Sequence, residues 1–225
     1  MAEFLTPERA LIFRIVHRAN LQTMLDDGLH CRNSQAAMKL FVQIGNPDLI
    51  DRRQTRVVEC PPGGVLSDYV PFYFTPFTPM MFNIKTGYNG ITKRPNEDIM
   101  IFVSSLHRLV TDGICFVFSD RHAYLKLAQF TNDLKNLDWI DWVSLKERNF
   151  KKDDIDRFER YQAEALVHEH MPISSLAGIV CYNSVIKSEV EAELQCESSI
   201  CKCSAEEDGI SNDHLHPRQS PGRGG

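Results

Sequence analysis

The sequence has no run of apolar residues long enough to cross a membrane, which takes about 20. Its first residues, MAEFLTPER, contain acids and no apolar core, so they do not resemble a secretory signal. Hydrophobic residues make up 43% of the chain and charged residues 24%, which is typical of soluble globular proteins. We therefore expect a cytoplasmic protein that does not associate with membranes.

Three common motifs are also missing. The sequence contains neither G-x-G-x-x-G nor G-x-x-x-x-G-K-[ST], so it offers no Rossmann or P-loop cradle for phosphates. The triplet HEH at 168–170 does not have the H-E-x-x-H spacing of zinc peptidases. Any nucleotide must therefore be bound by a different arrangement.

The seven cysteines cannot all pair within one chain, because their number is odd. Cys115 and Cys181 lie in the apolar runs ICFVF and GIVCY, and we expect both to be buried free thiols. Cys196, Cys201 and Cys203 cluster as CESSICKC, a spacing that fits no standard zinc site. No metal is predicted.

The net charge of −5 provides no general excess of bases for binding nucleic acid. The acids are concentrated in residues 136–195, whereas the first 135 residues carry slightly more bases than acids. A polyanion would have to bind to a local patch on the first part of the chain. Charge alone neither predicts nor excludes a DNA substrate.

Helices and strands alternate irregularly along the chain. Asn46-Pro47 and Thr78-Pro79 are typical starts of helices, and Gly28 and Gly87 are typical ends. We expect strands at LIFRIV, YVPFYF, DIMIFVSS, ICFVFSD and GIVCY, and further helices at SSLHRLVTDG, within 127–145 and at NSVIKSEVEAELQ. The absence of a regular βαβ order favours an α+β fold.

A change in composition marks the end of the folded part. From residue 196 onward the sequence is polar and rich in Gly, Pro and Ser. We therefore expect one folded domain over 1–195 and a disordered tail over 196–225.

The stretch FRIVHRAN places Arg14, His17 and Asn20 at the end of a predicted strand. Binding groups often emerge at such positions. A solvated strand face with an Asn cap for the next helix is the simpler alternative.

Aromatic residues and prolines are dense in PPGGVLSDYVPFYFTPFTPMM, which includes Tyr73 and Met80. This segment suits either a stacking platform for flat rings or the hydrophobic core. Pro71 lacks an N–H donor, so we expect its strand at an edge or a bulge.

Asp120, Arg121 and His122 follow the predicted strand FVF. They suit phosphate binding or substrate positioning, and equally a surface ion pair.

Glu164 is the one acid in the small, apolar stretch AEALV. A buried carboxylate is costly unless it is paired or used. An apolar pocket would raise its pKa toward neutrality and suit it to accept a proton or a sugar hydroxyl. The alternative is a structural ion pair with a cation such as Arg53 or Arg160.

These stretches, in order, resemble the DarT family of DNA ADP-ribosyltransferase toxins. The resemblance rests on IFRIVHRANL, DRR, GGVLSDYVPFYFTPFTPM, FVFSDRHAY and RYQAEALV, and it spans roughly residues 8–195. The residues in these motifs are similar to those of the branch of the family that modifies thymidine in single-stranded DNA. It implies an ADP-ribosyltransferase fold, a split mixed β-sheet with flanking helices around an NAD cleft.

The resemblance also implies roles for individual residues. Glu164 and Arg53 would be catalytic. NAD+, the co-substrate, would be bound by His17, Asn20, Arg14 and Tyr73, and the channel for the DNA base would be lined by Met80, Asp120, Arg121 and His122.

The implied activity is the sequence-selective transfer of ADP-ribose from NAD+ to thymidine in single-stranded DNA. The protein would be the toxin of a toxin–antitoxin pair, and its partner would be a macrodomain antitoxin. Two alternatives stay open: an inactive relative that binds NAD or single-stranded DNA, and an ADP-ribosyltransferase that modifies protein.

Overall fold

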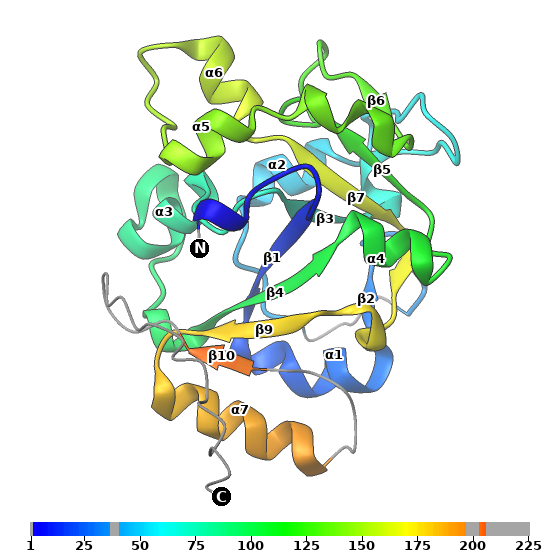
Figure 1. Ribbon diagram of the computed structural model, residues 1–225. Coiled ribbons are helices and arrows are strands. Elements are labelled where there is room, and N and C mark those ends of the chain that lie inside the picture. Colours follow the sequence, from blue (N-terminus) through cyan, green and yellow to red (C-terminus); the bar gives the residue numbers. More distant parts are fainter. Residues whose placement is uncertain (1, 37–40, 197–202, 206–225) are drawn as a thin grey trace, which may run out of the picture.

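The computed structural model describes residues 2–36, 41–196 and 203–205 (Figure 1). Eight strands form the main sheet in the order β10-β9-β4-β1-β3-β7-β5-β6, and two short strands, β2 and β8, pair separately. All neighbours in the main sheet are antiparallel except β9 and β10. The strands are β1 (Leu11–His17), β2 (Leu29–His30), β3 (Tyr69–Tyr73), β4 (Ile99–Ser105), β5 (Phe116–Ser119), β6 (Phe130–Thr131), β7 (Glu164–His168), β8 (His170–Met171), β9 (Gly178–Cys181) and β10 (Cys203–Ala205).

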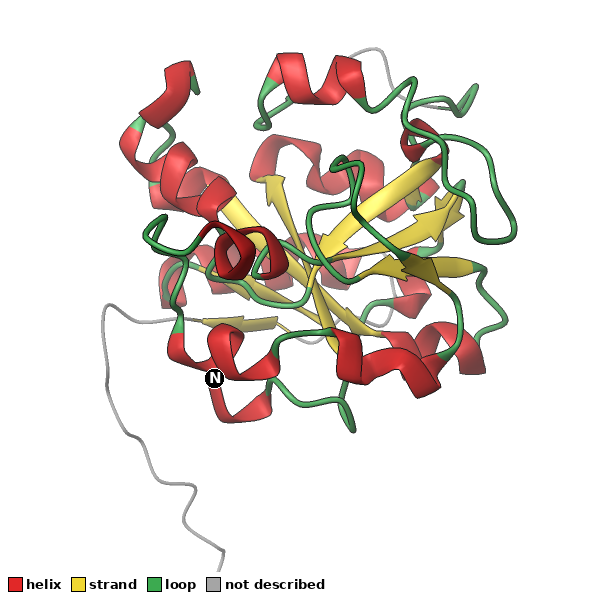
Figure 2. Cartoon of the chain, turned by 90° about the horizontal axis from the view of Figure 1, so that it is seen from above, coloured by secondary structure: helices red, strands yellow, loops and turns green. Residues whose placement is uncertain are grey.

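Helices flank the sheet, and Figure 2 shows them on more than one side of the strands. In Figure 1, α1 and α7 lie together at the bottom, beside β9 and β10, whereas α3, α5 and α6 lie at the upper left. The helices are α1 (Leu21–Asp27), α2 (Pro47–Arg52), α3 (Pro79–Thr86), α4 (Leu106–Thr111), α5 (Trp142–Glu147), α6 (Ile155–Arg160) and α7 (Ser184–Cys196). This mixed sheet with flanking helices confirms the α+β prediction.

The predicted helix caps are present. Asn46 Oδ1 accepts a hydrogen bond from Leu49 N, and Thr78 Oγ1 accepts one from Met81 N. Gly87 ends α3 with a φ of 75°, a left-handed conformation that glycine adopts without strain. Arg53 follows directly after the last residue of α2. The short α2 therefore delivers that arginine to the sheet.

The sheet is split between β1 and β3. These two strands share one register pair, Phe13 with Tyr73, whereas β1 and β4 pair along their whole length. Pro71 lies in β3 beside this split, and its carbonyl accepts a hydrogen bond of 2.8 Å from Arg14 Nη1. Of the two expected positions for Pro71, an edge or a bulge, the edge is wrong, because β3 lies between β1 and β7. The missing donor is tolerated because β1 diverges from β3 at this position.

Two further expectations need correction. Cys115 is exposed, although Cys181 is buried as expected, because Cys115 precedes β5 and does not form part of it. Within 127–145 the chain forms a two-residue strand, β6, and a 3-10 turn before α5, so this segment is less helical than predicted.

The tail boundary at residue 195 remains a prediction. Helix α7 ends at Cys196, and β10 is a three-residue strand inside the expected tail. Cys201 lies outside the described residues, as do the side chains of Cys196 and Cys203, so the cysteine cluster does too. Among the described residues, no His, Cys, Asp and Glu side chains are grouped as a metal site.

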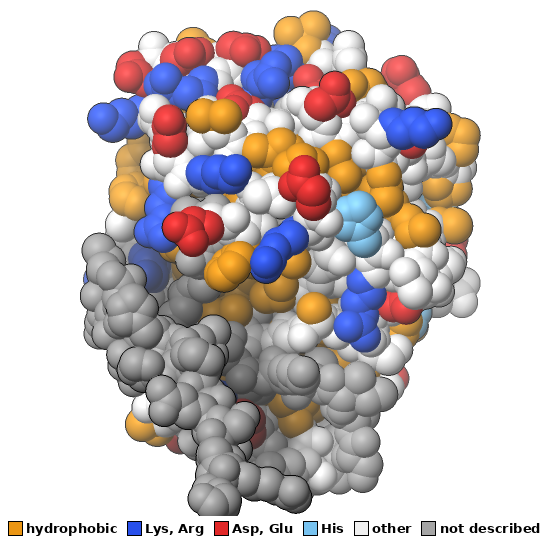
Figure 3. Space-filling view, in the orientation of Figure 1, with side chains coloured by type: hydrophobic (Ala, Val, Ile, Leu, Met, Phe, Trp, Pro, Cys, Tyr) orange, Lys and Arg blue, Asp and Glu red, His pale blue; other side chains and the backbone are white. Residues whose placement is uncertain are grey.

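The surface carries charges of both signs. Figure 3 shows acidic and basic side chains interspersed with apolar patches on one face. In the part of the chain that the structure describes, no helix is both long and apolar enough to span a bilayer.

Candidate active site

Glu164 opens β7 and is buried, with 2% of its surface exposed. Its Oε2 accepts a hydrogen bond of 2.8 Å from Arg53 Nη1. Its Oε1 accepts one of 3.1 Å from the Ala123 backbone N–H and lies 3.0 Å from His122 Nδ1. The carboxylate is thus held from two sides, by α2 and by the loop that follows β5.

Burial raises the pKa of Glu164, but the positive charges of Arg53 and His122 outweigh that effect and lower it to about 2. The expectation of a raised pKa is therefore wrong. The sequence shows the acid among apolar neighbours, but only the fold brings Arg53 and His122 to it. The ion pair with Arg53, which the sequence had left as an alternative, is present.

Tyr73 lies directly opposite Glu164 in the β3–β7 register. Its hydroxyl donates to Met80 Sδ at 3.3 Å, and burial together with the charge of Glu164 raises its pKa. Arg14 is close enough to Tyr73 and Arg53 to interact electrostatically with both, and burial lowers its pKa to about 10. The structure therefore brings Tyr73, Met80, Arg14 and Arg53 together around Glu164.

Asp120 and Arg121 play a different part from His122. Arg121 lies 3.0 Å from Asp120, 3.0 Å from Asp156 and 3.4 Å from Glu159, so three carboxylates hold its guanidinium. Asp120 Oδ1 also accepts the Gln129 N–H at 2.9 Å. These contacts brace the loop after β5 against α6. The surface ion pair weighed from the sequence is present, and a role for Asp120 and Arg121 toward DNA stays a prediction.

His17 is the last residue of β1, and Asn20 ends the 3-10 turn that follows it. Asn20 is buried, and its side-chain amide holds the backbone of Val42 by two hydrogen bonds, of 2.8 and 3.0 Å. This clamp fixes the segment that leads into α2 and Arg53. The His17 Nδ1 accepts the Ala19 N–H at 3.1 Å, which leaves the proton on Nε2.

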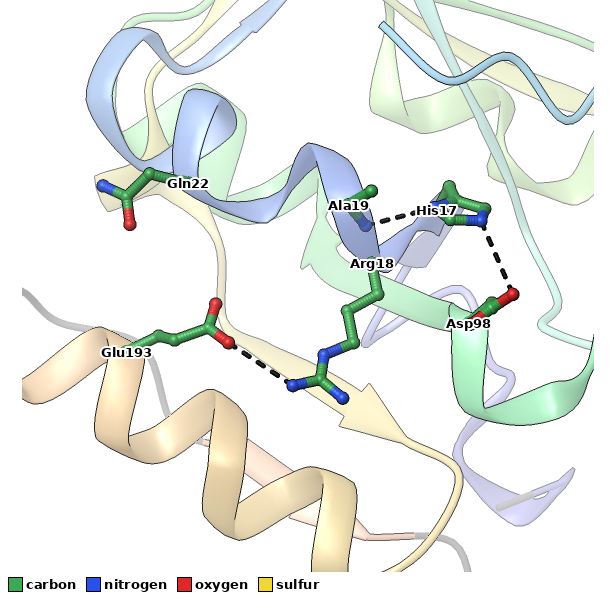
Figure 4. A pocket seen from close by; sticks show the side chains of 6 residues that line it. All are labelled: His17, Arg18, Ala19, Gln22, Asp98 and Glu193. Atoms are coloured by element: carbon green, nitrogen blue, oxygen red, sulfur yellow. Dashed lines mark hydrogen bonds and ion pairs between the residues drawn. The ribbon is translucent and has the colours of Figure 1, made fainter.

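A pocket of about 380 Å³ opens beside His17 (Figure 4). Its lining residues come from the end of β1, the turn and helix that follow it, the segment before β4, and α7: His17, Arg18, Ala19, Gln22, Asp98 and Glu193. The pocket therefore adjoins one of the two residues expected at the end of the NAD cleft.

Several buried donors near these residues have no hydrogen-bond partner among the described residues. They include Arg53 Nη2, Arg14 Nε and His17 Nε2. Buried donors are normally satisfied. Unpaired guanidinium and imidazole N–H groups suit the phosphates and hydroxyls of a dinucleotide, so the residues present fit NAD+.

Sequence reasoning missed two groups at the site. Ser119 Oγ accepts the Glu164 backbone N–H at 3.2 Å and fixes the start of β7. The Ala123 N–H holds the carboxylate itself. The serine lies in the stretch FSDRHAY and could have been considered. The Ala123 N–H could not, because the sequence does not show which backbone N–H groups donate to a side chain.

Comparison with known proteins gives consistent matches. A family model described as "ssDNA thymidine ADP-ribosyltransferase, DarT" matches residues 13–207, past the boundary at 195 where the motif resemblance ends. A "DNA ADP-ribosyl transferase" of Escherichia coli O127:H6 (strain E2348/69 / EPEC) is 49% identical over 189 residues, which cover 83% of this chain and 87% of that relative.

Solved structures match over nearly the whole fold. Thermus sp. 2.9 DarT in complex with ADP-ribosylated ssDNA superposes with a TM-score of 0.81 at 31% identity, over 89% of this chain and 95% of that one. The same protein in complex with NAD+ gives a TM-score of 0.76 at 31% identity, over 89% and 96%.

Proposed function

The chain belongs to the DarT family of ssDNA thymidine ADP-ribosyltransferases, and on that premise we propose that Glu164 and Arg53 carry out the transfer. Membership makes the protein an NAD+-dependent DNA ADP-ribosyltransferase. The observation that supports the residue assignment is the buried Arg53–Glu164 pair, which lies opposite Tyr73 beside the split in the sheet.

NAD+ supplies the ADP-ribosyl group and leaves nicotinamide behind when its glycosidic bond breaks. Positive charge develops on the ribose in that step. A carboxylate stabilises such charge, and it can accept a hydrogen bond from a ribose hydroxyl. Because the pKa of Glu164 is about 2, its carboxylate is ionised at every physiological pH. We assign Glu164 this electrostatic role first.

The new bond joins the ribose to a ring nitrogen of thymine, which loses its proton. A carboxylate with so low a pKa is a weak general base, so the low pKa argues against Glu164 as the main proton acceptor in the ligand-free geometry. Its pKa would rise if Arg53 turned away toward a phosphate. Within the described part of the chain, Arg53 Nη2 has no hydrogen-bond partner, so it is available as a donor for that contact.

Other residues position the two substrates. We assign His17, Arg14 and Tyr73 to the NAD+ site by direct contact, and Asn20 through the Val42 segment that it holds. We assign Met80 and His122 to the base channel, because Met80 contacts the Tyr73 hydroxyl and His122 contacts the Glu164 carboxylate. Asp120 and Arg121 shape that channel through the loop that they brace.

The biological setting is proposed by family resemblance. The protein would be a cytoplasmic toxin, its action sequence-selective, and a macrodomain antitoxin would remove the modification. Modification of a protein substrate is less favoured, since the matched family acts on single-stranded DNA.

One assay tests the function. The protein is incubated with NAD+ and four single-stranded oligonucleotides that each omit one base, and the products are weighed by mass spectrometry. We expect the gain of one ADP-ribose to depend on thymine, so that the oligonucleotide without thymine stays unmodified. Labelling of protein alone would support the protein-directed alternative. Binding of NAD+ without any product would identify an inactive relative.

A further inference from the structure

Two neighbouring methionines differ from the others in exposure. The structure describes five of the seven methionines, and three of them are buried: Met24, Met100 and Met171. Met80 and Met81, the second and third residues of α3, are half-buried. Oxidation of a thioether requires contact with the oxidant, so these two are the described methionines that a small oxidant in solution can reach.

The sulfur of Met80 is bound by a hydroxyl that lies beside Glu164. Tyr73 Oη donates a hydrogen bond to Met80 Sδ at 3.3 Å, and Tyr73 lies opposite Glu164 in the β3–β7 register. Burial and the charge of Glu164 raise the pKa of Tyr73, so the hydroxyl keeps its proton at physiological pH. A donor is therefore always present at this sulfur.

An oxygen added to the sulfur would compete for that donor. A thioether sulfur is a weak acceptor, whereas oxidation to a sulfoxide makes the side chain polar. The hydroxyl hydrogen of Tyr73 now points at the sulfur itself. For the hydrogen to reach the new oxygen instead, the side chain of Met80 or the ring of Tyr73 has to move.

The other neighbours of Met80 suit an apolar side chain. It packs against a cluster of buried isoleucines, which consists of Ile15, Ile44, Ile84, Ile91 and Ile99. A Cβ at Gly45 would lie 3.9 Å from Met80 Cε, so the methyl group lies against the segment that leads into α2 and Arg53. A polar group is costly in such surroundings. A sulfoxide would therefore disturb Tyr73 directly and Arg53 through this segment.

We propose that Met80 is an oxidative modification site, and that conversion of its thioether to a sulfoxide by a peroxide switches transfer off. One peroxide oxygen bonds to the sulfur, the O–O bond breaks, and the other oxygen leaves as water with both protons. The sulfur gives up an electron pair and the peroxide is reduced. Methionine sulfoxide reductases reverse the change. The inference rests on the proposed function, because it takes Met80 to line the base channel.

The test measures the oxidation of each methionine and the rate of transfer on the same samples. The full chain is treated with hydrogen peroxide, quenched, and then reduced with dithiothreitol, which reverses sulfenic acids and disulfides at cysteines but leaves methionine sulfoxide in place. Peptide mass spectrometry gives the fraction of sulfoxide at each methionine. We expect Met80 to be oxidised well before the three buried methionines. The single-turnover rate on a thymine-containing oligonucleotide should fall in proportion to the Met80 that remains unoxidised.

Full oxidation of Met80 should slow transfer about a hundredfold, because misplacing a group at a reacting centre by about 1 Å can cost that much. Treatment with two reductases, one for each epimer of the sulfoxide, should restore the rate. Met80→Leu has no sulfur at this position, so peroxide should not change its rate, whatever that rate is. Met81→Leu is the matched control, and peroxide should slow it as much as the wild type.

A rate that stays constant while Met80 becomes fully oxidised would overturn the proposal, as would equal sensitivity to peroxide in Met80→Leu and the wild type. Oxidation of Met80 no faster than that of the buried methionines would overturn it too. Failure of the proposed function looks different, because the untreated protein would then modify no oligonucleotide, although the sulfoxide at Met80 could still be mapped.

Discussion

Arg53 Nη1 donates a hydrogen bond of 2.8 Å to Glu164 Oε2, although the two residues are 111 positions apart in the sequence. Both are mostly buried, with 12% and 3% of their side-chain surfaces exposed. Removing one member of a buried pair leaves the other uncompensated. This pair therefore links the stability of the fold to the proposed chemistry.

Arg53→Lys keeps the positive charge but removes the planar fork of donors. We expect the single-turnover rate of transfer to fall roughly a hundredfold at saturating NAD+, because lysine cannot bond a carboxylate and a second acceptor in the same way. Arg52→Lys is the control, since Arg52 is the exposed neighbour on α2. Equal rates for the two variants would contradict the role of Arg53.

The low pKa of Glu164 predicts how stability depends on pH. The folded-state pKa is about 2 and the ordinary value 4.5, so the unfolded chain binds the proton first as the pH falls. The stabilisation is complete above about pH 5 and is lost as the pH falls through 4.5 toward 2, about 2 kcal/mol of it by pH 3.

Urea unfolding at a series of pH values measures this loss. The wild type should lose more stability between pH 6 and pH 3 than Glu164→Gln, which has no carboxylate at that position. If the free energy of unfolding depended on pH in the same way in both proteins, the pKa of Glu164 would not be lowered in the folded state.

Asn20→Ala removes both side-chain hydrogen bonds to Val42. We expect faster hydrogen exchange at the Val42 amide, a loss of about 1–3 kcal/mol in stability and a higher KM for NAD+, because the segment before α2 loosens. Asn132→Ala is the control, since its exposed side chain bonds the Pro61 carbonyl instead. Unchanged exchange at Val42 would refute the clamp.

His122 tests the support of the carboxylate from the loop side. His122→Ala removes the contact between Nδ1 and Glu164 Oε1, whereas His122→Asn retains an N–H donor. Transfer should fall about tenfold in the first variant and recover in part in the second. An equal loss of transfer activity in both variants would show that a hydrogen-bond donor at position 122 does not support transfer.

Local signals predicted much of the fold. The caps at Asn46 and Thr78 and the glycine that ends α3 depend on neighbours a few residues away, and all are present. The position of Pro71 in a central strand could not be predicted in this way. It depends on β1 diverging from β3 at that point, which is set by long-range pairing.

The candidate site shows the same limit. The apolar setting of Glu164 and its possible pairing with Arg53 could be inferred from the sequence, but the direction of its pKa could not. That direction depends on Arg53 and His122 arriving from two distant segments at once. The bracing of Arg121 by α6 likewise appears only in the fold.

Single-turnover transfer to a thymine-containing oligonucleotide by Glu164→Gln tests the central claim most directly. Glutamine preserves the size and the acceptor toward Arg53, and circular dichroism checks that the variant is folded. Glu147→Gln, on the exposed side of α5, is the control. We predict that the control modifies the oligonucleotide at the wild-type rate while Glu164→Gln gives no measurable product. Near-normal transfer by a folded Glu164→Gln protein would contradict the account.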